Sequence, residues 1–291
     1  MQYSDINGTS VSRFGLGTKR FPTEDSSRVI HMDTQAAHGI VEACLAHDVN
    51  FFDTSYSNHK GEAETFLGQE LATVAQPTYV ATSFFEMVDP RFDYVFQKQR
   101  KKLERDCIDF YSVEGVTDLN QEVNVTSGAI DYLFECKEQG QIGQLGFSAE
   151  LTAENLASFA KRYPWDFVRL RVNYFDWFEK EGRAQYEAAC EAGLPIIAHG
   201  ALRTGPATRL KDEALAVLKE ADPTRSSIDW ALRFVKSLPG VRTVSCNVYS
   251  VEQVEQGMAV FEDDVLLDGE QMAVLERAAQ AQRTRKGPAQ P

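Results

Sequence analysis

Hydrophobic and polar positions along the chain follow two different periods, which alternate from one segment to the next. Short apolar runs rich in β-branched and aromatic residues, such as residues 49–52, indicate buried strands. Longer segments, such as residues 34–48, repeat apolar positions every three or four residues and indicate amphipathic helices. Because the two kinds of segment alternate along almost the whole chain, the pattern predicts a series of βα units.

The pattern predicts eight strands, each followed by a helix. The strands are expected at residues 11–18, 49–52, 78–82, 107–113, 144–148, 166–173, 194–198 and 242–246. The helices are expected at residues 34–48, from residue 61 onward, and at residues 92–104, 129–137, 153–162, 184–191, 226–236 and 251–261. Eight βα units in about 260 residues favour closure into a (β/α)8 TIM barrel over an open sheet.

Segments at both ends complete the predicted domain. Asn7-Gly8 predicts a tight hairpin turn before the first barrel strand, because this pair readily adopts positive φ angles. Residues 269–282 have a helical period and predict an extra C-terminal helix. Residues 1–282 are therefore expected to form a single barrel, and residues 283–291, basic and with two prolines, a disordered tail.

Composition limits which binding partners and which cellular compartment are expected. A net charge of −13 argues against nucleic-acid or anionic-membrane partners, which require a basic face. The chain has no run of about 18 apolar residues and no signal-peptide pattern at residues 1–5. The five cysteines are scattered and do not have metal-ligand spacing, so we expect free thiols, no metal and a cytoplasmic location. A small molecule is the expected partner.

Polar side chains stand at the predicted carboxyl ends of the strands. Asp53 follows the apolar run at residues 49–52, and Glu114 follows the run at residues 107–113. The carboxyl ends of parallel barrel strands meet at one mouth, where barrel enzymes hold their catalytic residues. We therefore expect one site at this mouth, surrounded by Asp53, Ser83, Glu114, Ser148, Arg169 and His199.

Short motifs at these strand ends occur in a recognisable order. They are Phe52-Asp53-Thr54, Gly61-Glu62-Ala63-Glu64, Ile108-Asp109-Phe110-Tyr111, Gly146-Phe147-Ser148, Asn173-Tyr174 and Trp230-Ala231-Leu232-Arg233. In this order and spacing the chain resembles the aldo-keto reductases, most closely a bacterial branch that often carries an added iron–sulfur domain. The four-cysteine run that such a domain needs is absent from the sequence.

The resemblance implies a catalytic tetrad, and this chain differs from the family at three of its four positions. In the family, Tyr, Lys, Asp and His together pass a proton to a carbonyl while NADPH supplies hydride. Asp53 matches the Asp, but the Tyr position is Asn58, the Lys position is Ser83 and the His position is Glu114. Because neither Asn nor Ser supplies the proton or the charge, the ordinary reaction is not expected to run.

The resemblance also implies cofactor positions, and several of these differ. Ser148 and Asn173 match positions that contact substrate or cofactor, but Arg169 stands where a Gln beneath the nicotinamide is expected. Asn247 replaces a glycine near the adenosine phosphate, and its side chain would crowd the approach of backbone to phosphate. Arg242 remains available to hold an anion. We therefore expect weak or absent dinucleotide binding, with NADPH still possible as a cofactor.

The favoured hypothesis is a small-molecule enzyme that has abandoned hydride transfer. Asp53 and Glu114 would act as an acid–base pair, because two close carboxylates push one pKa upward unless an arginine intervenes. Arg169 or Arg171 would hold an anionic substrate. Lyase, dehydratase or isomerase chemistry suits such a pair.

Two alternatives remain open. In the first, the chain is an NADPH-dependent reductase of carbonyls or enones that recruits Tyr56 or His59, on the same loop as Asn58, as its acid. In the second, it is a non-catalytic relative that binds a ligand at the mouth, where the arginines neutralise both carboxylates. His199, at the end of the seventh predicted strand, is a candidate site residue in all of them.

Overall fold

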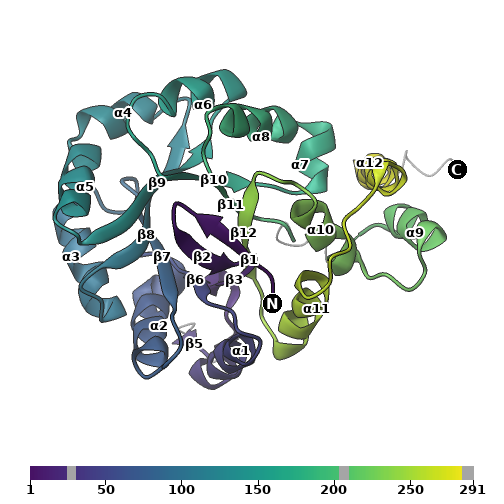
Figure 1. The fold of residues 1–291 in the computed structure, drawn as a ribbon, viewed down its shortest axis with the longest axis horizontal. Coiled ribbons are helices and arrows are strands. Elements are labelled where there is room, and N and C mark those ends of the chain that lie inside the picture. Colours follow the sequence, from purple (N-terminus) through teal and green to yellow (C-terminus); the bar gives the residue numbers. More distant parts are fainter. Residues whose placement is uncertain (25–30, 203–209, 284–291) are drawn as a thin grey trace, which may run out of the picture.

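The structure, a computed structural model, describes residues 1–24, 31–202 and 210–283. Eight parallel strands close into a barrel in the order β10-β11-β12-β3-β6-β7-β8-β9 (Figure 1). They are β3 (Phe14–Gly17), β6 (Phe51–Asp53), β7 (Tyr79–Phe84), β8 (Ile108–Thr117), β9 (Ile142–Glu150), β10 (Phe167–Arg171), β11 (Ile196–His199) and β12 (Val241–Asn247). The predicted (β/α)8 barrel is confirmed.

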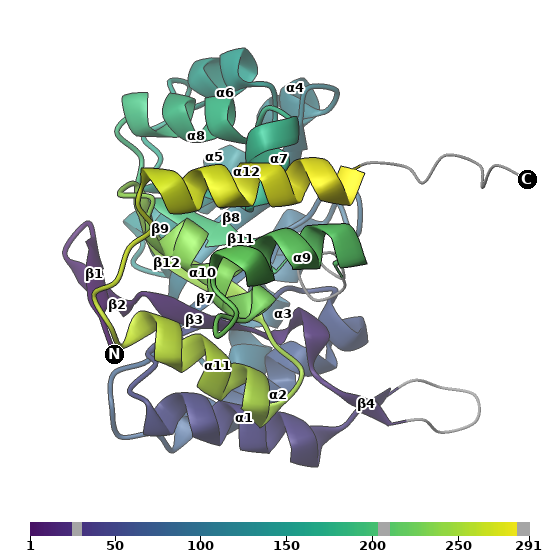
Figure 2. The same ribbon diagram turned by 90° about the vertical axis from the view of Figure 1, so that its right-hand side faces the viewer.

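Helices surround the barrel, one after each strand (Figure 1). The predicted ones are α1 (Thr34–Ala46), α2 (Glu62–Ala72), α3 (Phe92–Leu103), α5 (Ala129–Glu138), α6 (Ala153–Phe159), α8 (Gly182–Glu191), α10 (Ser227–Lys236) and α11 (Val251–Phe261). The extra C-terminal helix is α12 (Gly269–Arg283), which runs alongside α9 (Asp212–Ala221) (Figure 2). No helix in the described part of the chain is long and apolar enough to span a bilayer.

Three helices were not predicted from the sequence. Two are single short segments, α4 (Gln121–Thr126) and α7 (Tyr174–Glu179), too brief to show a helical period. The third is α9, which buries only Ala214 and Leu218 and therefore has a weak apolar stripe. Of the predicted tail, only Arg283 is described, as the last residue of α12, and residues 284–291 lie outside the described residues.

A hairpin closes the amino-terminal end of the barrel. Its strands are β1 (Tyr3–Ile6) and β2 (Thr9–Ser12), joined by Asn7 and Gly8 at φ angles of 47° and 88°, as the turn chemistry predicts. The predicted first barrel strand at residues 11–18 is divided, because β2 belongs to the hairpin. The Ser12 hydroxyl donates to the Phe14 carbonyl (2.7 Å), and the chain then enters the barrel as β3.

Aromatic rings fill the barrel interior below the site. Phe51, Phe110 and Phe167 are fully buried and meet edge to face, with ring centres 5.3 and 5.7 Å apart, above the hairpin residues Ile6 and Val11. Edge-to-face contact suits the opposite charges of ring edge and ring face. This apolar floor excludes water from beneath the polar side chains at the carboxyl ends of the strands. Electrostatic interactions between charged side chains there are therefore stronger than in water.

Candidate active site

Polar side chains from the carboxyl ends of the barrel strands share one cavity. Asp53 ends β6, Arg169 and Arg171 lie at the end of β10, and His199 ends β11. The cavity has a volume of about 400 Å³, within the range of roughly 300–1,000 Å³ that small-ligand sites occupy. It is lined by Lys19, Asp53, Thr54, Ser55, Ser57, Asn58, Phe85, Glu114, Glu150, Arg169, Arg171, His199, Gly200 and Asn247.

Arg169 lies between the two carboxylates on the floor of the cavity. Its Nη2 donates to Asp53 Oδ2 at 2.8 Å, and its Nη1 donates to Glu114 Oε2 at 3.3 Å. Nη1 also reaches the Ser112 hydroxyl at 3.4 Å, and the Ser245 hydroxyl donates to the same Asp53 oxygen. Arg169 is only 8% exposed and Asp53 only 6%, so this ion pair is shielded from water.

The surroundings of the two carboxyls move their pKa values in opposite directions. Burial raises the pKa of Asp53, and the attraction of Arg169 and the hydrogen bond from Ser245 only partly oppose this rise. Burial raises the pKa of Glu114, but opposing contributions, of which the attraction of Arg169 is the largest, outweigh it and lower the pKa of Glu114. Burial opposes the charge of Arg169, yet Asp53 and Glu114 raise its pKa overall. Glu114 is therefore the carboxyl more readily ionised and free to accept a proton, and Asp53 is the one more readily protonated and able to donate.

His199 is uncharged at neutral pH. Burial, followed by the repulsion of Arg169, lowers the pKa of its imidazole from 6.5 to about 3, although Glu114 opposes this shift. A neutral imidazole has one nitrogen that donates and one that accepts a hydrogen bond. His199 is thus suited to hydrogen bonding with a substrate oxygen without bringing a second positive charge beside Arg169.

Several buried polar atoms at the cavity have no hydrogen-bond partner among the described residues. They are Asp53 Oδ1, Arg169 Nε, His199 Nε2 and the Ser83 hydroxyl, which lies near Glu114 without hydrogen-bond geometry. Leaving a buried polar atom unpaired typically costs about 1–3 kcal/mol, so such atoms are rare in native structures. Their concentration at one cavity indicates a site built to bind a polar molecule.

The rim of the cavity carries further charges. Arg171 Nη2 donates to Glu150 Oε1 at 2.9 Å, and both side chains are about half exposed. Lys19 is exposed, and its backbone N–H donates to Asn247 Oδ1 at 3.1 Å. Asn58 Nδ2 donates to Thr18 Oγ1 at 3.0 Å and faces the cavity. The rim cations are accessible to an incoming anion, whereas Arg169 is already engaged by two carboxylates.

Five residues expected at the site do not line the cavity, among them Ser83, which is fully buried on β7. Tyr56 turns its ring toward α3, with Lys102 Nζ 5.1 Å from the ring centre, and His59 Nε2 lies 3.2 Å from the Thr18 carbonyl oxygen. Neither side chain lines the cavity, because the loop continues through left-handed backbone at residues 59–61. The expectation that Tyr56 or His59 replaces the missing acid is therefore wrong in geometric terms.

Ser148 and Asn173 also lie outside the cavity lining. Ser148 is buried on β9 beside Arg169, and Asn173 is the N-cap of α7. Asn173 Oδ1 accepts from Asp176 N, and its amide donates to Asp176 Oδ2 at 2.8 Å, so both of its polar groups are used locally. Asn173 therefore stabilises a helix start in this chain, which explains its presence without a ligand.

Sequence reasoning missed several residues of the site, among them Ser245, Lys19 and Glu150. Ser245 comes from the middle of β12, where the sequence offers no sign that one serine bonds Asp53. Lys19 lies in the short 3-10 helix η1 (Thr18–Arg20) after β3, and Glu150 ends β9 beyond the predicted strand. Following every predicted strand for two further residues would have found Lys19 and Glu150, because the first turn after each strand also faces the mouth.

The described residues do not fit a dinucleotide in the manner that the family resemblance implies. The Asn247 side chain packs against Gly17, where an added Cβ would meet Asn247 Oδ1 at 2.6 Å. The space between Gly200, Ala201 and Asn247, at the ends of β11 and β12, is only about 20 Å³. About 10–15 Å³ of this kind of space holds one water, so the opening has room for about one water unless side chains move.

Comparison with known proteins defines the class to which this barrel and its site belong. A sequence model of the Aldo/keto reductase family matches residues 13–280, so the chain belongs to the aldo/keto reductase family. An uncharacterized oxidoreductase of Mycobacterium tuberculosis is 26% identical over 316 residues, covering 97% of this chain and 94% of that protein. A second such oxidoreductase, from Mycobacterium bovis, has the same identity and coverage.

Three solved structures share the fold. An aldo-keto reductase of Bacillus halodurans has a TM-score of 0.78 and 22% identity, with 96% of each chain covered. The glycerol dehydrogenase of Gluconobacter oxydans has a TM-score of 0.79 and 18% identity, covering 99% of this chain and 98% of that one. An aldo-keto reductase of Klebsiella pneumoniae, solved in complex with NADPH, has a TM-score of 0.74 and 19% identity, with the same coverage. At these identities the likeness shows the fold alone.

Proposed function

We propose that this protein is a small-molecule enzyme that moves protons on an anionic substrate without using NADPH. The observation that carries the proposal is the pair of carboxyls held by one guanidinium, with the pKa of Asp53 raised and that of Glu114 lowered. Pairs of acids whose surroundings separate their pKa values are typical of general acid–base sites. The unpaired polar atoms around them support binding of a polar molecule there.

In this proposal each side chain has a role. Arg171 and Lys19, on the rim, attract a substrate carboxylate by charge. Glu114, ionised, takes the proton from a carbon next to a carbonyl, and the electron pair of the broken C–H bond moves to the carbonyl oxygen. His199 donates a hydrogen bond to that oxygen, and Arg169 favours the developing negative charge. Asp53 returns a proton to the product, as in an isomerase or a dehydratase.

A proton-exchange experiment tests this proposal directly. The protein is incubated in D2O with pyruvate, 2-oxobutyrate and 2-oxoglutarate, and loss of the C–H signal next to the carbonyl is followed by proton NMR. We expect exchange well above the rate without protein for at least one of these anions, and none for acetone, which has no carboxylate. Reduction of simple aldehydes with NADPH at ordinary enzyme rates, about 1–10³ per second, would contradict the proposal.

The second candidate function is NADPH-dependent reduction, which family membership and the oxidoreductase relatives favour. It requires a proton donor near the substrate carbonyl, and the family's Tyr and Lys positions hold Asn58 and Ser83. Among the described residues at the cavity, Asp53 is the acid with the raised pKa, so it would have to donate the proton. Dinucleotide binding separates the two candidates and is treated in the last prediction below.

We also propose that the protein works in the cytoplasm. All five cysteines are free thiols, and Cys44, Cys136 and Cys246 are buried in the apolar core. Burial raises the pKa of the Cys44 thiol, which disfavours the reactive thiolate. Free cysteines without disulfides are usual in reducing compartments. Separation of cell fractions followed by detection of the native protein tests this placement.

A further inference from the structure

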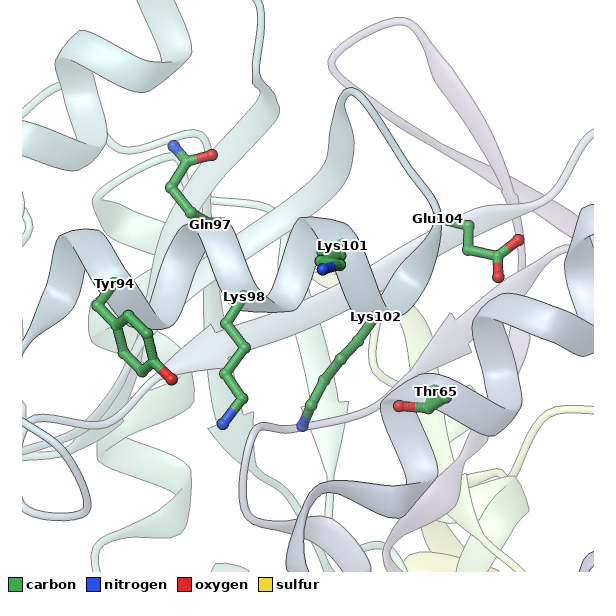
Figure 3. A pocket seen from close by; sticks show the side chains of 7 residues that line it. All are labelled: Thr65, Tyr94, Gln97, Lys98, Lys101, Lys102 and Glu104. Atoms are coloured by element: carbon green, nitrogen blue, oxygen red, sulfur yellow. The ribbon is translucent and has the colours of Figure 1, made fainter.

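A groove on the outside of the barrel, between α2 and α3, has the composition of an anion-binding site. Figure 3 shows its side chains, with those of Lys98 and Lys102 extending from α3 toward the same side. The groove has a volume of about 590 Å³, which suits a small molecule. Its lining residues, here called the lysine groove, are Thr65, Tyr94, Gln97, Lys98, Lys101, Lys102 and Glu104.

Two of the three lysines of the lysine groove carry charges that no ion pair neutralises among the described residues. Among the described residues, neither Lys98 nor Lys101 forms an ion pair with a carboxylate, and Lys102 reaches only Glu64, at 3.3 Å. Three lysines face a single lining carboxylate, Glu104, on a protein whose net charge is −13. A local excess of cations on an acidic protein attracts small anions and selects against basic partners.

Aromatic rings hold the ammonium groups of the groove in place. Lys98 Nζ lies 5.5 Å from the centre of the Tyr94 ring and 5.6 Å from that of Tyr56, and Lys102 Nζ lies 5.1 Å from the latter. Such contacts on the surface are weaker than charge-assisted hydrogen bonds to phosphate oxygens. A polyphosphate would therefore draw both ammonium groups away from Tyr56. Tyr94 is 47% exposed and can stack on a flat ring.

The lysine groove is joined to the catalytic cavity by one strained loop. Lys102 Nζ donates to the Gly61 carbonyl at 2.9 Å, directly after His59 and Lys60, whose φ angles of 48° and 56° are disfavoured for residues with a Cβ. Earlier residues of the same loop, Ser57 and Asn58 among them, line the cavity. A ligand that moves Lys102 thus acts on the loop that also shapes the catalytic cavity.

We propose that the lysine groove binds a small molecule with two or more adjacent phosphate groups, and that its binding changes the loop at residues 54–61. Lysine is a common phosphate ligand as a point charge, and three of them around one groove match a polyphosphate. The loop carries the change because Lys102 and Tyr56 connect it to the groove. This inference does not depend on the reaction proposed for the cavity.

Calorimetric titration with inorganic pyrophosphate and with adenosine diphosphate tests the binding. The Lys98→Ala/Lys101→Ala variant should lose at least about tenfold in affinity for both, because it removes two charged donors. The matched control is Lys161→Ala/Lys219→Ala, which removes two exposed lysines elsewhere and should change affinity by less than about twofold. Tighter binding of adenosine diphosphate that is lost in Tyr94→Ala identifies a nucleotide, and equal binding identifies the phosphates alone.

Amide hydrogen exchange of residues 54–61 tests the link to the loop. Pyrophosphate should alter exchange of this segment in the wild-type protein and leave it unchanged in Lys98→Ala/Lys101→Ala. Absence of saturable binding, or equal loss of affinity in the control variant, would overturn the site. Self-association that disappears in the groove variant alone would also overturn it, because a second acidic copy of the chain would then be the occupant.

Discussion

Arg169 binds both carboxylates of the cavity through separate nitrogens, which only a guanidinium with its fixed fork of donors can do. A lysine at this position would present one compact charge from a single nitrogen in place of this fixed fork. The bidentate contact also makes the two carboxyls unequal, since Asp53 accepts at 2.8 Å and Glu114 at 3.3 Å. Different burial and different neighbours then separate their pKa values.

If this pair is catalytic, Asp53→Asn and Glu114→Gln should each lower the exchange rate by about 10²–10⁴-fold, the usual contribution of a general acid or base. Both changes keep size and hydrogen bonding, so the barrel should stay folded, as measured by circular dichroism and thermal unfolding. The matched control is Glu122→Gln, an exposed carboxylate on α4 paired only with Arg162. Unchanged exchange together with a lower melting temperature would instead assign the pair a structural role.

His199 allows a test of how the stability of the protein depends on pH. Its pKa is about 3 in the folded protein against 6.5 normally, so below pH 6.5 the unfolded chain binds a proton that the folded one does not. Stability is therefore lost as pH falls. Between pH 7 and pH 5 this histidine should account for at most about 2 kcal/mol of lost stability. Urea unfolding at both pH values should show a smaller loss in His199→Gln, and an equal loss would contradict a depressed pKa.

A site residue could be predicted from the sequence when it lay in or next to a barrel strand. Asp53 ends β6, and Glu114 and Arg169 lie within β8 and β10, so the topology of the barrel alone brings these side chains together. Tyr56 and His59 lie in a loop whose left-handed backbone turns them away from the cavity. No local sequence pattern predicts that residues 59–61 all have positive φ angles. Loop residues were therefore the least predictable part of the site.

At the scale of elements, a buried polar network joins α2, α3 and β7. Glu64 is fully buried and accepts from Thr82 at 2.9 Å, from Gln99 at 2.7 Å and from Lys102 at 3.3 Å. The Tyr111 hydroxyl from β8 donates to Gln99 in turn. The donors come from β7 and α3 and the carboxylate from α2, so the network ties both helices to the barrel.

Glu64→Ala should lower the free energy of unfolding by about 3 kcal/mol, because it removes the buried carboxylate that pairs with Lys102 and accepts from Gln99. Chemical denaturation measures this loss. The control is Gln69→Ala, an exposed position on the same helix, which should change stability by no more than about 0.5 kcal/mol. Equal effects of the two substitutions would show that the network adds nothing to the packing of α2.

The order of elements was predictable where the apolar period was strong. The strands alternate with helices whose buried faces repeat every three or four residues, as in α1 with Ala37, Ile40, Val41 and Cys44. The prediction was wrong for residues 11–18, since one apolar run serves both the hairpin and the barrel. Where the chain leaves one sheet and enters another is decided by tertiary contacts, such as the Ser12–Phe14 hydrogen bond.

At the scale of the whole molecule, family membership and the geometry of the mouth favour different reactions. The family resemblance implies a dinucleotide at the ends of β11 and β12, whereas the Asn247 side chain lies against Gly17 there and the described residues leave room for about one water. Fold alone does not determine chemistry, because the reaction resides in the side chains at the strand ends. The proposal of cofactor-free proton transfer follows from those side chains, and dinucleotide binding is the observation that separates it from reduction.

Thermal unfolding with and without NADPH therefore tests the molecule as a whole. A ligand present at 100 times its dissociation constant stabilises a protein by about 2.7 kcal/mol, which corresponds to a melting shift of about 5 °C or more for a chain of this size. We expect NADPH and NADP⁺ at millimolar concentration to shift the melting temperature by less than about 1 °C. The NADPH-binding reductase of Klebsiella pneumoniae is the positive control. A full shift in this protein would mean that the mouth rearranges to admit the cofactor, and the reductase hypothesis, with Asp53 as proton donor, would then replace the one proposed.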